Sequence, residues 1–459
     1  MDHGLPRPFE NDCDWLLRYC RLPLHVGRGR VERHGNPDSP NAQVWRKFGQ
    51  LMRGSQSPPP ESGFAAAFFL PVDSNLRIFL SWPNDDRLGK SFGENLTVKG
   101  NTADGEFELA CPEYYVKLAS DTREQPGWAV AESVNKPAII SYGEARSVSS
   151  VTAMMNNFDF ENGNCTDSSD SEAPQVLRVE AAGTTVDFAW RPERGELRRL
   201  VDAGLLANSS FVTFSFAAWS GASIDELSQF AYRISSFCQY VVRQHTAIPL
   251  LSFFDGEGRV VSRSSNTVLR SKFRDDCALP VMHLDDGLPQ LFRESFDEHC
   301  RMQQSQLWRL MPSHIASVED PPYLEQKYAS LMAAVELLIR SSLIENGHMN
   351  AAEAESKTLP ELVGMARGVM RWTVPKHYTA ADRYRETRNA VDHGAELPHD
   401  SRLVRADFDK WKLFLLRRLF MRLGFTGRLT SPKDGWKSFS AVEEFSEEHN
   451  SFSFPTGSK

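Results

Sequence analysis

The sequence lacks the features of several common protein classes. Its seven cysteines are odd in number and widely spaced over 459 residues, with no CxxC, so neither a disulfide framework nor a zinc site is expected. No apolar run approaches the roughly 18 residues that span a bilayer, and the N-terminus lacks the pattern of a signal peptide. We therefore expect a cytoplasmic protein without a membrane partner, a metal or another cofactor.

Excess positive charge is also missing. The net charge is -8, which argues against a protein that coats nucleic acid along its whole surface. The segment from Met311 to Arg428 nevertheless has more basic than acidic residues, which favours an anionic partner for the C-terminal part. The apolar fraction of 41% is that of a globular protein, and the length fits two or three domains.

Breaks in residue pattern divide the chain into five segments of an α+β protein. The first break is the linker Pro58-Pro59-Pro60, which no helix crosses. We predict an N-terminal extension, a β-rich N-terminal domain, a helical connector, a C-terminal all-α bundle and a flexible tail, with bounds 1–60, 61–285, 286–320, 321–428 and 429–459.

The β-rich domain is predicted from alternation of apolar and polar residues. Leu76, Ile78 and Leu80 alternate with Arg77 and Phe79, and this period of two residues continues to about residue 220. Such alternation is typical of an antiparallel sheet with one buried face. Ser223 and Glu226 form a capping-box pattern that opens an amphipathic helix. A hairpin is expected around residues 255–258.

Helical periodicity takes over from about residue 285. A connector helix is expected from Pro289 to about Met311, with the proline in its first turn. Four bundle helices follow, over about 321–345, 359–372, Thr379 to His393, and from Asp400 or Ser401 to Gly424. Short links between four helices predict an antiparallel bundle.

The end of the third bundle helix carries the residues best suited to chemistry. Asn389 and His393 lie four apart on one helix face, and Arg388 can reach the same pocket. The helix dipole favours the protonated imidazolium of His393, which suits proton transfer, and Arg388 suits the charge that develops on a phosphorane. This set predicts metal-independent RNA cleavage by 2'-hydroxyl attack, leaving a 2',3'-cyclic phosphate and a 5'-hydroxyl.

The segment Arg388-Asn389-Ala390-Val391-Asp392-His393 resembles the R-x4-H pattern of HEPN domains, and its helical context fits them. Together with Asn75 to Leu80 and Leu96 to Gly105, the chain is similar to ApeA-like HEPN proteins of bacterial anti-phage defence over about 60–426. The resemblance implies a HEPN-like bundle that forms a homodimer with a composite cleft. It also implies abortive infection by cleavage of RNA, possibly tRNA, and an N-terminal domain that senses a phage-derived trigger.

Other residues have a functional and a structural interpretation. Tyr384, Lys376, Lys410 and Arg417 are candidate RNA contacts. Core packing is the favoured interpretation of Tyr384, and a solvated helix face is the alternative for the two basic residues of the last helix. Supporting roles beside the motif are predicted for Glu336 and Asp392, with an ordinary salt bridge as the alternative. The isolated histidines His283, His299 and His314 are expected to be structural.

Two other functions remain open. The bundle would serve only dimerisation or RNA binding if Arg388 and His393 form a structural ion-pair network that ends a helix. A third interpretation is the toxin of a toxin–antitoxin pair.

Overall fold

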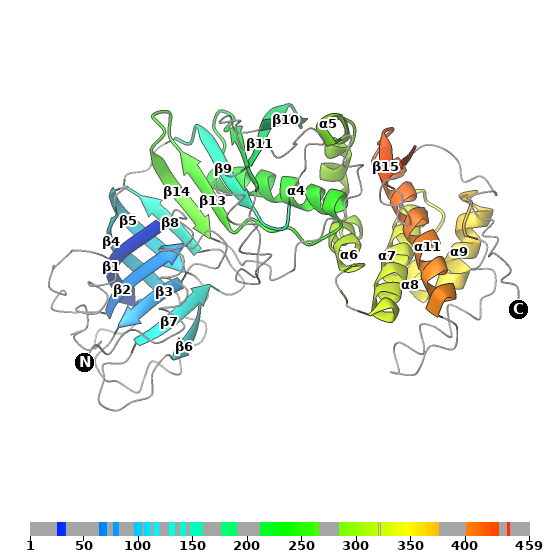
Figure 1. The fold of residues 1–459 in the computed structure, drawn as a ribbon, viewed down its shortest axis with the longest axis horizontal. Coiled ribbons are helices and arrows are strands. Elements are labelled where there is room, and N and C mark those ends of the chain that lie inside the picture. Colours follow the sequence, from blue (N-terminus) through cyan, green and yellow to red (C-terminus); the bar gives the residue numbers. More distant parts are fainter. Residues whose placement is uncertain are drawn as a thin grey trace, which may run out of the picture.

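The computed structural model describes the strands, helices and connections over residues 25–33, 64–70, 77–81, 96–102, 105–111, 114–118, 128–133, 138–143, 147–158, 176–190, 212–265, 284–319, 321, 323–375, 401–430 and 438–440. An antiparallel sheet occupies the N-terminal half, and helices dominate the C-terminal part (Figure 1). The predicted α+β class is confirmed at this level.

The described strands of the N-terminal half form one sheet in which all neighbours are antiparallel, in the order β10-β11-β12-β9-β13-β14-β8-β5-β4-β1-β2-β3-β7-β6. Strands β1 to β8 lie at the end far from the helical part (Figure 1). The first seven strands are β1 (His25–Arg33), β2 (Phe64–Leu70), β3 (Arg77–Ser81), β4 (Leu96–Thr102), β5 (Gly105–Cys111), β6 (Tyr114–Leu118) and β7 (Trp128–Ser133). The other seven are β8 (Ala138–Tyr142), β9 (Ser150–Met155), β10 (Val176–Ala181), β11 (Thr184–Trp190), β12 (Val212–Ala217), β13 (Leu250–Phe254) and β14 (Val260–Ser265).

Strand β1 lies inside the segment that the sequence predicted to be an extension. It pairs with β2 on one side and with β4 on the other, so it is an interior strand of the sheet. The Gly27-Arg28-Gly29-Arg30 stretch is typical of a loop by composition, but its residues alternate with the period of a strand. The boundary at residue 60 is therefore corrected, since part of the sheet comes from before it.

Helix α4 (Ile224–Val242) packs its apolar face on the sheet. Ser223 accepts a hydrogen bond from the backbone N–H of Glu226, and the Glu226 carboxylate accepts one from the Ser223 N–H, which confirms the capping box. Phe230 meets Phe216 of β12 edge to face, with ring centroids 5.0 Å apart. The predicted hairpin is also confirmed, because Asp255 accepts hydrogen bonds from the N–H groups of Glu257 and Arg259 between β13 and β14.

The connector differs from the single helix that was predicted. Helix α5 (Leu284–Met302) begins before Pro289, which lies inside the helix and not in its first turn. The missing proline N–H leaves one helical hydrogen bond unmade. After a turn the chain forms the 3₁₀ helix η5 (Trp308–Leu310) and the short helix α6 (Met311–Ser317).

Three C-terminal helices begin and end close to the predicted positions: α7 (Leu324–Glu345), α9 (Leu359–Gly368) and α11 (Ser401–Arg422). The short helix α8 (Ala351–Ser356), between α7 and α9, was not predicted. Helix α7 contacts both α9 and α11. The helix predicted from Thr379 to His393 lies outside the described residues. The strands β15 (Arg428–Thr430) and β16 (Ser438–Ser440) pair within the segment predicted as a flexible tail, because the fully buried side chain of Leu429 anchors this part.

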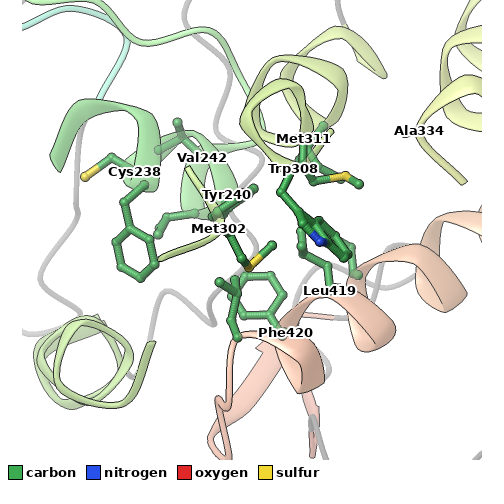
Figure 2. Close-up of a cluster of buried hydrophobic side chains, with 14 of the residues drawn as sticks. Cys238, Tyr240, Val242, Met302, Trp308, Met311, Ala334, Leu419 and Phe420 are labelled. Carbon is green, nitrogen blue, oxygen red and sulfur yellow. The ribbon is translucent and has the colours of Figure 1, made fainter. Parts of the chain in front are cut away.

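A continuous apolar core links the sheet to the C-terminal helices. Buried side chains from β9, β11 and β12 contact those of α4 and α5, and the same cluster continues into α7, α9 and α11. At the junction, Trp308, Met311, Leu419 and Phe420 gather beside Tyr240 of α4 (Figure 2). The two halves therefore share buried apolar surface, which couples their stabilities.

Candidate functional site

Most of the predicted catalytic set lies outside the described residues. This applies to Arg388, Asn389 and His393, to their neighbours Tyr384 and Asp392, and to Lys376, which all fall in the segment 376–400. Their predicted roles remain predictions. The chain on either side of this segment is described, ending at Pro375 and resuming at Ser401.

The flanks of the segment are anchored in the bundle. Val374 is buried, and the indole of Trp372 meets the Phe414 ring of α11 at a centroid distance of 6.0 Å. The Arg418 guanidinium stacks over the Trp372 ring at 5.0 Å, which is a cation–π contact. The segment is therefore held at one end by aromatic packing against α11.

Glu336, predicted to support the motif, has a described partner within its own helix. Its Oε1 lies 2.6 Å from Nη2 of Arg340, one turn further along α7. The same Nη2 donates to the backbone carbonyl of Lys357, just after α8. Through Arg340, this pair links α7 to the connection between α8 and α9. The contact agrees with the interpretation of Glu336 as an ordinary salt-bridge residue. A contact to Arg388 stays a prediction, because Arg388 lies outside the described residues.

Lys410 and Arg417 lie inside the protein. Only 6% and 3% of their surfaces are exposed, whereas both interpretations of these residues required an open face of the last helix. Burial lowers the pKa of Lys410, against the effect of Asp407. A phosphate could meet either side chain only if this face of α11 opened, so their assignment as RNA contacts remains a prediction.

A buried ion cluster lies where the connector meets the bundle. The Lys412 ammonium of α11 donates to Oε1 of Glu319, which follows α6, and the Lys327 ammonium of α7 donates to Oε2 at 2.9 Å. The Glu319 and Lys412 residues are 8% and 5% exposed. One carboxylate therefore joins the connector to two bundle helices.

The pKa values in this cluster follow from its burial and charges. Burial acts to raise the pKa of Glu319, but the ammonium groups of Lys412 and Lys327 reverse the effect and lower it to about 2. Burial and the nearby charge of Arg243 lower the pKa of Lys412, against the pull of Glu319. Burial raises the pKa of Asp409, one turn before. These contacts fix the position of α11. Both carboxylate oxygens of Glu319 already accept hydrogen bonds from Lys412 and Lys327.

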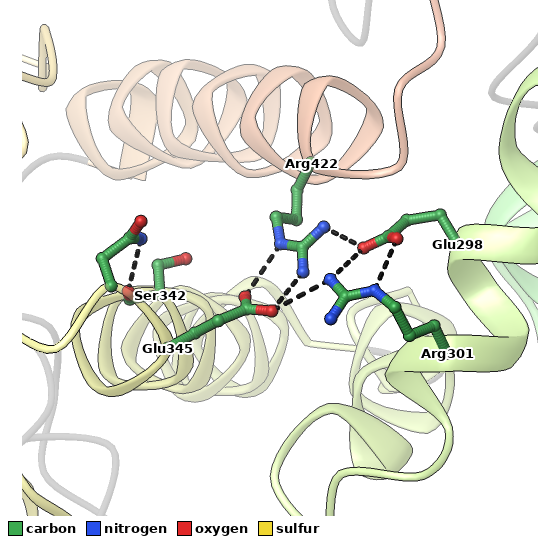
Figure 3. Close-up of polar contacts among 6 residues, drawn as sticks. Glu298, Arg301, Ser342, Glu345 and Arg422 are labelled. Carbon is green, nitrogen blue, oxygen red and sulfur yellow. Dashed lines mark hydrogen bonds and ion pairs between the residues drawn. The ribbon is translucent and has the colours of Figure 1, made fainter.

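A second ionic cluster surrounds the C-terminal end of α11 (Figure 3). Arg422 donates to the carboxylates of Glu345 of α7 and Glu298 of α5. Arg301 of α5 donates to the same two carboxylates, at 2.6–2.7 Å to Glu298 and 3.0 Å to Glu345. We call these four residues the charge ring. Two acids and two bases alternate around it, so its net charge is zero.

His299 is built into the apolar core. His299 is fully buried among Phe237, Tyr240 and Phe296, and its Nε2 shares a 2.9 Å hydrogen bond with Ser236 Oγ. Burial lowers the pKa of His299 to about 3, so the ring is neutral at physiological pH. The structural interpretation predicted for His299 is therefore confirmed.

Both ionic clusters escaped prediction because their members are distant in sequence. Nothing in the local pattern joins Glu319 to Lys412 or Glu298 to Arg422, which are 93 and 124 positions apart.

Among the residues that the structure describes, no group of three or more His, Cys, Asp or Glu is placed to hold a metal ion. Of the helices in those ranges, none is long and apolar enough to cross a membrane. Comparisons with protein-family profiles, curated proteins and solved structures found no match.

Proposed function

We propose that the protein is a metal-independent endoribonuclease of the HEPN type that acts in anti-phage abortive infection in the cytoplasm. Arg388 would stabilise the phosphorane, His393 would transfer the proton, and Asn389 would orient one of them or a ribose hydroxyl. The observation that carries the proposal is the R-x4-H pattern, placed in sequence between α9 and α11 of a packed helical bundle. Two copies would form the cleft, and the RNA, possibly tRNA, would be the substrate.

The described part of the bundle supports this proposal by the way it holds the flanks of the motif segment. Trp372 and Val374 pack on one side of the segment, and α11 begins on the other. Catalysis by positioned groups needs a rigid scaffold, because a shift of about 1 Å can cost about 100-fold in rate. The Glu319–Lys412 contact fixes α11 at its middle.

The direct test compares purified wild-type protein with His393→Ala and Arg388→Ala on total RNA and on tRNA. We expect cleavage by the wild type, loss of cleavage in both variants, unchanged cleavage in EDTA, and products with 2',3'-cyclic phosphate ends. His348→Ala is the matched control, because His348 is an exposed histidine of the same bundle. Equal RNA integrity in wild type and the two motif variants would contradict the proposal.

A non-catalytic interaction or RNA-binding module is the second candidate. The burial of Lys410 and Arg417 favours its interaction form over RNA binding, because these two candidate RNA contacts are withdrawn from the open surface. Phage protection that persists in the His393→Ala variant would support this candidate. Protection that depends on His393 together with RNA cleavage would contradict it. A growth assay distinguishes the toxin alternative from both candidates. It predicts that the wild-type protein is toxic to cells without phage unless a second gene is supplied.

A further inference from the structure

Helix α5 has two chemically different faces. Its apolar face packs into the sheet domain, where Phe292 lies 5.7 Å from Phe188 of β11 and 4.8 Å from Phe237 of α4, measured between ring centroids. Phe296 continues this contact with Phe230 and Phe237. By its buried surface, α5 therefore belongs to the sheet domain.

The polar face of α5 is directed at the bundle. Gln290, Glu294, Glu298 and Arg301 recur every three or four residues and so share one side of the helix. Glu294 accepts hydrogen bonds from the backbone N–H and Oγ1 of Thr426, just beyond α11. Glu298 and Arg301 form half of the charge ring. Every member of this stripe has a contact that leads to α7, to α11 or to the residues after it.

The charge ring joins α5 to the bundle by ion pairs. Arg422 binds Glu345 within the bundle and also binds Glu298 across the interface, and Arg301 mirrors this from the α5 side (Figure 3). The hydrogen bond from Arg301 and the charge of Arg422 hold the pKa of Glu298 below its usual range. Glu298 is therefore ionised at neutral pH, where it accepts hydrogen bonds from both guanidinium groups of the ring.

The four side chains of the charge ring are partly exposed, so its α5 half can separate from its bundle half. The side chains of Glu298, Glu345 and Arg422 are 23–29% exposed, and that of Arg301 is 57% exposed. Charges that remain in contact with water are screened by salt. The α5 half can leave while the Arg422–Glu345 pair stays formed, so neither half would be left with an unpaired charge.

We propose that the charge ring is an ionic latch through which the sheet domain restrains the helical bundle. When closed, it holds the end of α11 against α5. When Glu298 and Arg301 withdraw, the end of α11 is released while the apolar junction around Trp308 stays intact. The restraint on cleavage rests on the proposed function, whereas the latch itself does not.

The test removes only the α5 half of the ring. The double variant Glu298→Gln, Arg301→Gln keeps the net charge and leaves the Arg422–Glu345 pair in place. The matched control is Arg178→Gln, Asp187→Asn, which removes an exposed ion pair of the β10–β11 hairpin, also without changing net charge. Hydrogen exchange is measured on the full chain over residues 417–426, and RNA cleavage is measured with and without His393→Ala.

The latch predicts exchange in residues 417–426 that is about fivefold faster in the Glu298→Gln, Arg301→Gln variant than in the wild type and the control. High salt should reproduce this change in the wild type. Cleavage should rise only in the variant that keeps His393. Unchanged exchange would overturn the latch.

Failure of the proposed function gives a different pattern. If neither wild type nor variants cleave RNA, exchange alone decides on the latch. If exchange is faster in the Glu298→Gln, Arg301→Gln variant but its His393-dependent cleavage equals that of the wild type, the restraint on cleavage is overturned. The ribonuclease proposal then stands. The single variant Arg301→Gln, at the most exposed member, provides the same readings if the double variant folds poorly.

Discussion

The ammonium group of Lys412 lies against the carboxylate of Glu319 inside the protein, although the two residues are 93 positions apart. Lys327 binds the other carboxylate oxygen at 2.9 Å. A buried ion pair need not add net stability, but removal of one partner leaves an uncompensated buried charge. This asymmetry makes Glu319 a sensitive position at the junction of connector and bundle.

The first prediction is that Glu319→Gln lowers the free energy of unfolding by about 3 kcal/mol. The physical reason is the buried Lys412 ammonium, which would lose its carboxylate. Urea unfolding at neutral pH measures the change. Glu355→Gln is the control, because Glu355 is exposed on α8, and it should stay within about 0.5 kcal/mol of the wild type. A similar small effect for Glu319→Gln would show that the cluster contributes little.

The second prediction concerns stability in acid. The pKa of Glu319 is about 2 in the folded protein and about 4.5 in the unfolded chain, where the carboxyl is solvated, so the unfolded chain binds more protons between these pH values. The stabilisation is complete above pH 4.5 and is lost as the pH falls towards 2. Glu319→Gln should therefore flatten the pH dependence of the free energy of unfolding in this window. An unchanged slope would contradict the assigned pKa.

The helices of the bundle could be predicted because their burial is periodic. Leu331, Val335 and Leu338 of α7 are fully buried at helical spacing, and the capping box at Ser223 marks the start of α4. These signals are local, so they are present in the sequence before any tertiary contact forms. Strand β1 was missed because glycine and arginine are unusual strand residues, and only pairing with β2 and β4 stabilises it.

The chemistry was predictable only where it was local. Asn389 and His393 share a predicted helix face by spacing alone. The ionic clusters depend on how α5, α7 and α11 are packed, and no local spacing connects Glu298 with Arg422. The burial of Lys410 and Arg417 has the same origin, since a basic residue is expected at the surface until its neighbours are known.

The third prediction concerns His299. Burial lowers its pKa from 6.5 to about 3, so the unfolded chain binds the extra proton between these values. The contribution of His299 to stability is therefore complete above pH 6.5 and is lost as the pH falls towards 3. His299→Gln keeps a group that can bond Ser236 and removes the titration, so stability should fall less steeply through this range. Urea unfolding across the range measures it, with the exposed His348→Gln as control, and identical slopes would contradict the prediction.

The fourth prediction follows from the shared core. Phe420 is fully buried at the junction, whereas its neighbour Met421 is 41% exposed. Phe420→Ala should lower the free energy of unfolding by about 3–5 kcal/mol, and Met421→Ala should stay within about 0.5 kcal/mol of the wild type. Because Phe420 belongs to the cluster that reaches the sheet strands, both halves should unfold in one transition that Phe420→Ala shifts as a whole.

Two probes separate this outcome from independent unfolding of the halves. Far-ultraviolet circular dichroism near the helical minimum follows mainly the bundle, and hydrogen exchange in β9 to β13 follows the sheet. Coincident transitions in wild type and in Phe420→Ala are expected, since one cooperative unit gives the same midpoint by every probe. A Phe420→Ala protein in which the helices melt while β9 to β13 stay protected would contradict the coupling. The sheet would then be an independent domain, and the apolar junction of Figure 2 would contribute nothing to its stability.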